Sequence, residues 1–262
     1  MTKIIAVANQ KGGVGKTTTC VNLTASLAAT KRRVLLIDLD PQGNATMGCG
    51  TEKSEITLSI KDVLLDDVSI SDAIIHTPVK FDLVPANGDL TVAEVRLLKL
   101  ENKEYKLKQV LAAIRDKYDF IFIDCPPAVN MLTVNAFAAA DSVLIPMQCE
   151  YYALEGITGL LNTIEYFRQA LNPSLQIEGI LRTMYDGRNR LAIDVSEQLA
   201  THFGEKVYHT VIPRNVRLAE APSHGLPALY YDKCSQGATA YLALAGEMVR
   251  RSVQVIECMP EH

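Results

Sequence analysis

The residues that point most directly to chemistry form a glycine- and lysine-rich run, Lys11-Gly12-Gly13-Val14-Gly15-Lys16-Thr17-Thr18. Apolar residues 4–8 before it are typical of a buried strand, and residues 20–28 after it have helical spacing. In a strand–loop–helix context, glycines let backbone N–H groups face a polyphosphate, and the helix N-terminus adds positive potential. Lys16 would then reach the β- and γ-phosphates, and the Thr17 hydroxyl would ligate Mg²⁺. The alternative is a loop that has this composition by chance.

The loop departs from the common G-x-x-x-x-G-K-[ST] pattern at its start. Gln10 stands where the pattern has glycine, and a second lysine follows at Lys11.

Two aspartates are placed to act beside this loop. The continuous apolar runs Val34–Ile37 and Phe120–Ile123 predict central strands buried on both faces, and Asp38 and Asp124 follow them directly. Ligands of open α/β sheets bind at carboxyl strand ends, so Asp124 fits a carboxylate that holds Mg²⁺ through a water shell. A helix cap or turn residue is the alternative for Asp124. Asp38 either orients the metal shell or caps its strand.

Strand-like runs recur along the chain, with helical patterns between most of them. They lie at 4–8, 33–37, 81–84, 119–123, 142–146 and 177–182. This alternation predicts an α/β fold with a mostly parallel, doubly wound sheet flanked by helices. We expect one domain over 1–262, with a short tail at 253–262 and no DNA-binding extension before the first strand.

Composition excludes several function classes. With 48% hydrophobic and 21% charged residues, the chain is typical of a globular protein with a full core. A net charge of −4 argues against coating nucleic acid with the whole surface, but a local basic patch stays open. The six cysteines show no metal-site spacing and are expected to be reduced thiols. No signal peptide and no membrane-spanning run is recognised, so a cytoplasmic location is expected.

The loop that begins with Lys11 resembles the signature of the ParA/MinD class of ATPases, which includes the nitrogenase iron protein. Three further stretches narrow the resemblance: Asp38–Asn44, Ile123–Pro127 and Ile212–Leu218. Together they resemble the ParA/Soj chromosome-partitioning ATPases, from about Lys3 to Arg251.

The resemblance implies a deviant P-loop NTPase that hydrolyses ATP with Mg²⁺. Lys11, Lys16 and Asp40 are the implied catalytic residues, Asp40 by polarising the attacking water. The alternative for Asp40 is a plain turn, because Asp-Pro and Gly-Asn are common turn formers. The residues expected around the metal are Thr17, Asp40 and Asp124. The residues expected at the nucleotide are Lys11, Gly12, Gly13, Val14, Gly15, Lys16, Thr17, Thr18, Pro213 and Asn215, the last two against adenine.

Lys11 implies a partner subunit. In this class the signature lysine crosses to the phosphates of a second protomer, so ATP would drive a face-to-face homodimer. The alternative is a solvated lysine.

Four arginines suggest double-stranded DNA as a second partner. Arg188, Arg190, Arg214 and Arg217 are expected in loops after strands, where they could form a basic stripe in the dimer. Such a stripe contacts phosphates, so binding would be non-specific and salt-sensitive. The alternative is that these arginines are only solvated. A ParB-like centromere-binding protein is the implied stimulator of hydrolysis, and the protein would then be nucleoid-associated.

Three other functions are weighed against partition. A MinD-type membrane cycle is disfavoured by the acidic, proline-broken end, Cys258–His262. A positioning ATPase that moves a cargo other than DNA is the second alternative. A nucleotide-dependent metabolic ligase would need a second substrate pocket.

Overall fold

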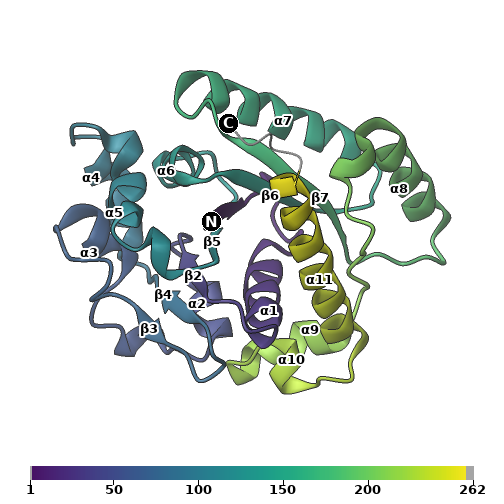
Figure 1. Ribbon diagram of the computed structural model, residues 1–262, viewed down its shortest axis with the longest axis horizontal. Helices are drawn as coiled ribbons and strands as arrows, with labels where there is room; N and C mark the ends of the chain where they lie inside the picture. Colours follow the sequence, from purple (N-terminus) through teal and green to yellow (C-terminus); the bar gives the residue numbers. More distant parts are fainter. Residues whose placement is uncertain (1, 258–262) are drawn as a thin grey trace.

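The computed structural model describes residues 2–257. A seven-stranded sheet runs through the centre in the order β3-β4-β2-β5-β1-β6-β7 (Figure 1). The strands are β1 (Lys3–Val7), β2 (Val34–Asp38), β3 (Ile75–His76), β4 (Asp82–Val84), β5 (Phe120–Asp124), β6 (Ser142–Gln148) and β7 (Gln176–Thr183). All neighbouring strands pair in parallel except β3, which pairs antiparallel with β4.

Side chains of the central strands alternate between two cores, one on each face. In β1, Ile4 and Ala6 pack into one core, and Ile5 and Val7 into the other. All of these side chains are nearly inaccessible to solvent. Burial on both faces explains why these strands are continuous apolar runs.

Helices cover both faces. One face carries α3 (Ile60–Leu65), α4 (Leu90–Leu97), α5 (Lys106–Ala112), α6 (Met131–Ala139) and α7 (Ala153–Ala170). The other carries α1 (Lys16–Ala29), α2 (Asn44–Gly48), α9 (Val216–Glu220), α10 (Ala228–Tyr231) and α11 (Gln236–Glu257). Helix α8 (Arg190–Phe203) packs with residues of β6, β7 and α7 in a third, smaller core. Figure 1 shows α1 and α11 side by side, and they share one of the most extensive helix contacts in the fold.

Short 3₁₀ helices complete the connections. They are η1 (Lys53–Glu55), η2 (Lys103–Tyr105), η3 (Arg115–Lys117), η4 (Gly204–Lys206) and η5 (Ala221–His224). None of the helices within residues 2–257 combines the length and apolar character needed to cross a membrane.

The predicted α/β class and mostly parallel sheet are confirmed, and each predicted strand is present within two residues of its expected bounds. The two-residue strand β3 was not expected. Helix α11 continues to Glu257, so the first half of the tail expected at 253–262 is helical, and 258–262 lie outside the described residues.

Candidate functional site

The glycine-rich loop joins β1 to α1 at the carboxyl edge of the sheet. Gly13 and Gly15 have left-handed backbones, with φ of 74° and 87°. This conformation favours glycine because a Cβ is strained there. Gly15 is the N-cap of α1, and no side chain caps that helix or places an acid in its first turn. The backbone N–H groups at this end therefore face the loop without a competing carboxylate, as an anion site requires.

Lys16 points into its own loop. It is only 8% exposed, and its Nζ donates to the Lys11 carbonyl at 3.3 Å. The loop is also fastened from β7, because the Thr183 hydroxyl donates to the Val14 carbonyl at 2.8 Å. The predicted phosphate lysine is thus held inward on a braced loop.

Lys11 points away from that loop. Its side chain is 55% exposed and forms an ion pair with Glu150, which is 49% exposed, at 2.5 Å. Its backbone N–H donates to Asn9 Oδ1, and Asn9 is tied to Pro146 of β6. The two lysines of the run therefore face different directions from one short segment.

Asp38 and Asp124 lie side by side, as their strand ends predicted. They are register partners at the last position of β2 and β5, and both side chains are fully buried. Asp38 Oδ2 accepts from the Thr46 N–H at 2.8 Å and from the Thr46 hydroxyl at 2.7 Å. Asp124 Oδ1 accepts from the Cys20 thiol at 3.5 Å, but Asp124 Oδ2 has no hydrogen-bond partner among the described residues.

Burial shifts both carboxyls toward the neutral form. Desolvation raises the pKa of Asp124 well above its ordinary range, and the nearby Asp38 charge raises it further. Desolvation likewise raises the pKa of Asp38, although the Thr46 donors oppose it. A cation beside this pair would offset the cost of two buried carboxylates.

The residues fit a magnesium ion. Asp124 Oδ2 has no partner among the described residues, and the Thr17 hydroxyl at the start of α1 is close enough to lower the pKa of Asp124. Within residues 2–257, no three acidic, histidine or cysteine side chains form a complete metal cage. Phosphate oxygens and water would therefore complete the coordination, as they commonly do for Mg²⁺.

Asp40 lies in a tight turn just past β2. Its Oδ1 accepts from the Gln42 N–H at 2.9 Å, and its carbonyl accepts from the Gly43 N–H at 2.8 Å. Its own N–H donates to Asp38 Oδ1 at 3.2 Å, which ties the turn to the buried carboxyl pair. Asp40 therefore forms the turn that the sequence allowed and also lies next to the predicted metal site.

Pro213 and Asn215 lie beside the phosphate loop. They line a cavity of about 180 Å³ whose wall also includes Gly15 and Thr18. Asn215 Oδ1 is buried and has no hydrogen-bond partner among the described residues. The structure brings the two segments together as predicted, and the adenine contact itself stays a prediction.

The four arginines differ in their surroundings. Arg188, with a 91% exposed side chain, pairs with Asp186 at 2.9 Å, and Arg217 pairs with Glu220 at 2.8 Å and with a second acid, Asp232. Among the described side chains, those of residues 2–252, Arg190 and Arg214 form no ion pair.

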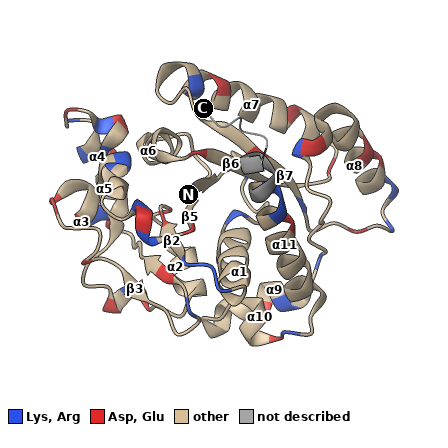
Figure 2. Cartoon of the chain, in the orientation of Figure 1, with Lys and Arg blue, Asp and Glu red and all other residues tan. Residues whose placement is uncertain are grey.

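The two arginine segments lie next to each other, because the N–H of Arg214 donates to the Tyr185 carbonyl at 3.3 Å. Figure 2 shows basic residues near the start of α8 and at α9, with acidic ones among them. Not all four arginines are in loops: Arg190 begins α8, and Arg217 belongs to α9.

Several site residues were not singled out from the sequence. They are Thr46, Thr183 and Cys20. Thr183 and Cys20 bond to distant segments, 169 residues apart for Thr183 and Val14, whereas Thr46 bonds to Asp38 within the same connection. Threonine and cysteine are ordinary core residues, so no sequence signal marked them.

Comparisons with known proteins agree with the site. A family model described as an AAA domain matches residues 2–177. The sporulation initiation inhibitor protein Soj of Bacillus subtilis is 54% identical over 95% of this chain and 98% of its own. The chromosome partitioning protein ParA of Myxococcus xanthus is 50% identical over 95% of this chain and 88% of its own.

A solved structure is similar over nearly the whole fold. It is the crystal structure of cobyrinic acid a,c-diamide synthase from Mycobacterium smegmatis with bound ATP analogue and magnesium. It is 40% identical, with a TM-score of 0.84, over 95% of each chain. The ATP analogue and magnesium bound to that neighbour agree with the ATP and Mg²⁺ expected from the loop. The chain belongs to the ParA/Soj family of chromosome-partitioning ATPases.

Proposed function

We propose that ATP binding joins two copies of this chain into a sandwich dimer that binds duplex DNA without sequence preference. A ParB-like partner then stimulates hydrolysis, and the dimer releases the DNA. The protein would in this way associate with the nucleoid and help partition DNA.

The observation that carries the proposal is the position of Lys11. A lysine needed only for its own nucleotide would point inward, as Lys16 does. Lys11 instead lies half exposed at the surface, in an ion pair with Glu150. An exposed ion pair contributes little stability, so Lys11 can exchange Glu150 for the phosphates of a partner at small cost.

The chain's own groups support phosphoryl transfer in defined roles. Lys16 and the N–H groups at the start of α1 would bind the phosphates, and Thr17 and Asp124 would hold Mg²⁺. When bound, Mg²⁺ supplies neutralising charge at the β- and γ-phosphates. Asp40 would orient the attacking water from the turn tied to Asp38. Slow intrinsic turnover is expected if the partner supplies a further cation.

Arg190 and Arg214 are the best candidates for DNA contact, because neither forms an ion pair among the described side chains, those of residues 2–252. Arg188 and Arg217 would have to leave their carboxylates to bind a phosphate. Contacts of this kind carry no sequence information and weaken as salt rises.

Lys11→Ala tests the dimer. We expect the variant to bind ATP and stay monomeric by light scattering, whereas the unmodified chain dimerises with ATP and not with ADP. Lys99→Ala removes another exposed lysine and should dimerise normally. An ATP-induced dimer of Lys11→Ala would contradict the proposal.

Arg190→Glu tests the DNA surface. A glutamate at the first turn of α8 is compatible with the helix, so folding should be preserved. We expect duplex affinity to fall at least tenfold with ATP affinity unchanged, whereas Lys99→Glu, with the same charge change, retains DNA binding. Equal duplex affinity in both variants would refute the assignment of Arg190.

The named diamide synthase suggests a ligase as a rival function. That structure is 40% identical to this chain, whereas Soj is 54% identical. A ligase consumes ATP only with its second substrate, whereas a partition ATPase is stimulated by DNA and its partner protein. If neither DNA nor the partner protein changes the rate of ATP hydrolysis, the result would favour the ligase function.

A further inference from the structure

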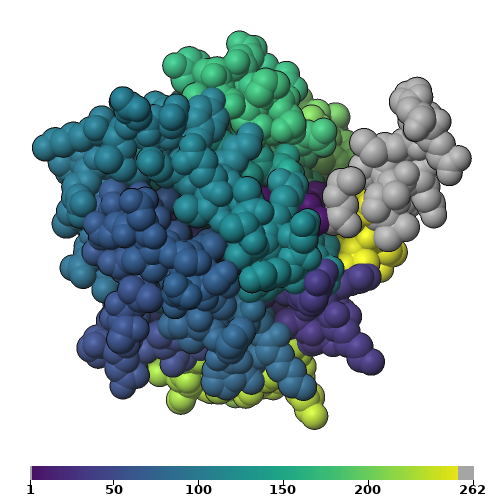
Figure 3. Space-filling view, turned by 60° about the vertical axis from the view of Figure 1, so that its left-hand side comes forward, coloured from purple at the N-terminus to yellow at the C-terminus, as the bar shows by residue number. Residues whose placement is uncertain are grey.

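A second hollow lies at the opposite edge of the sheet from the ATP site. Its wall includes Val34 and Asp82, the first residues of β2 and β4, and Tyr118, just before β5. Asp38 and Asp124 lie at the other ends of β2 and β5. Figure 3 shows segments of the α1–β2 turn (purple), the β3–β4 region (blue) and the α5–β5 connection (teal) meeting on one face. The hollow therefore belongs to none of the functions described above.

The volume and floor of the hollow suit a small organic ligand. It encloses about 460 Å³, within the range of small-molecule sites. Val34, Ile74 and Phe81 supply apolar surface, and Ser71 adds a hydroxyl.

The rim is strongly basic. Arg32, Arg33, Lys80 and Lys117 line it, against a single acid, Asp82. Arg33 pairs with Asp119, whereas Arg32, Lys80 and Lys117 form no ion pair with any side chain of residues 2–252. Several like charges around one concavity raise the local concentration of anions.

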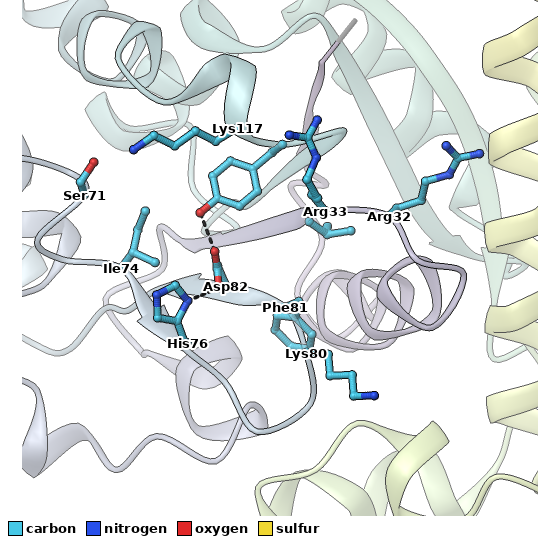
Figure 4. A pocket seen from close by; sticks show the side chains of 11 residues that line it. Arg32, Arg33, Ser71, Ile74, His76, Lys80, Phe81, Asp82 and Lys117 are labelled. Atoms are coloured by element: carbon cyan, nitrogen blue, oxygen red, sulfur yellow. Dashed lines mark hydrogen bonds and ion pairs between the residues drawn. The ribbon is translucent and has the colours of Figure 1, made fainter.

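Asp82 forms no ion pair with these lysines and arginines, because both of its oxygens contact other side chains. Oδ2 accepts from the Tyr118 hydroxyl at 2.6 Å, and Oδ1 lies 2.6 Å from His76 Nδ1. Burial and the Asp82 charge raise the pKa of Tyr118, so the phenol stays protonated and keeps donating. Figure 4 shows Asp82 and His76 between Lys117 and Ser71 on one side and Arg32, Arg33 and Lys80 on the other, with the head groups of Arg32 and Lys80 directed outward.

We propose that this hollow binds a polyphosphate chain, either free or carried by a nucleoside. Cations on two sides of a small hollow suit a ligand that carries several negative charges within a short length, as a polyphosphate does. Arginine and lysine both bind phosphate well. Lys80 also has a left-handed backbone, with φ of 67°, where glycine or asparagine is favoured. The strained turn presents a cation at the rim. The inference does not depend on the dimer or on DNA binding.

The test separates this site from the ATP site by location. The protein is saturated with ADP and Mg²⁺, then titrated with tripolyphosphate or with uridine diphosphate while backbone amide shifts are recorded. We expect amides of residues 71–82 and 115–118 to move in a saturable way, with those of the glycine-rich loop unchanged. A stronger response to uridine diphosphate identifies a nucleotide site, and a stronger response to tripolyphosphate identifies a site for the free chain.

Paired double variants test the charges. Arg32→Ser with Lys117→Ser removes two exposed rim cations and should weaken binding at least tenfold. Lys99→Ser with Arg168→Ser removes the same charge elsewhere and should weaken it less than twofold. Equal losses, or no movement of the rim amides, would overturn the proposal. If a short duplex moves the same amides more strongly than either polyphosphate, the site binds nucleic acid and the proposal is also overturned.

Discussion

Thr46→Val is a sharp test of the network that holds the acidic end of the site. The Thr46 hydroxyl donates to buried Asp38 at 2.7 Å and accepts from the Ala86 N–H at 3.0 Å. Valine fills nearly the same volume but makes neither bond. A lost hydrogen bond to a charged group costs about 1.5–3 kcal/mol, and an unpaired buried N–H costs about 1–3 kcal/mol. Because the remaining structure relaxes in part, we expect a loss of roughly 3 kcal/mol in the free energy of unfolding.

Urea unfolding of the nucleotide-free protein measures this change. Thr24→Val is the matched control, because the Thr24 side chain is equally buried and its hydroxyl has no hydrogen-bond partner among the described residues. Removing an unpaired buried hydroxyl should leave stability unchanged or raise it. ATP turnover should fall in Thr46→Val alone, since Asp38 also anchors the turn of Asp40. If Thr46→Val lowers the free energy of unfolding no more than Thr24→Val does, the proposed hydrogen-bond network is refuted.

Two further predictions test other parts of the fold. Burial alone would raise the pKa of Glu247, but hydrogen bonds, chiefly from Thr210, outweigh it and lower the pKa below 4.5. This stabilisation is present above pH 4.5 and lost as pH falls through the folded pKa. Glu247→Gln should therefore lower the thermal midpoint at pH 7, and the difference should shrink below pH 4.5. A pH-independent difference would contradict this reasoning. A Cβ at Gly237 would lie 2.5 Å from Leu218 and 3.1 Å from Asn215 Oδ1. Gly237→Ala should therefore weaken ATP binding several-fold by calorimetry, and unchanged affinity would argue against Asn215 as an adenine contact.

The carboxyl edge of the sheet was predictable from sequence for a geometric reason. Parallel strands end at the same edge, so two apolar runs that each end in aspartate bring Asp38 and Asp124 together. Glycine spacing likewise predicted the loop, because Gly13 and Gly15 occupy backbone conformations that favour glycine.

Neither the ion-pair partners of the arginines nor the contacts between distant segments were predictable. The pairing of Arg188 with Asp186 and of Arg217 with Glu220 follows from local turns and side-chain geometry, which residue type alone does not set. Strand β3 has only two residues, too few for a periodic pattern. The basic hollow joins three segments at the amino ends of the strands, and only the topology brings them together.

The affinity for a random-sequence duplex, measured with ATP and with ADP at two salt concentrations, tests the central claim most directly. The account predicts tight binding with ATP, weak binding with ADP, and a loss of affinity at the higher salt. Equal binding with both nucleotides, or none with either, would contradict an ATP-driven dimer that holds DNA.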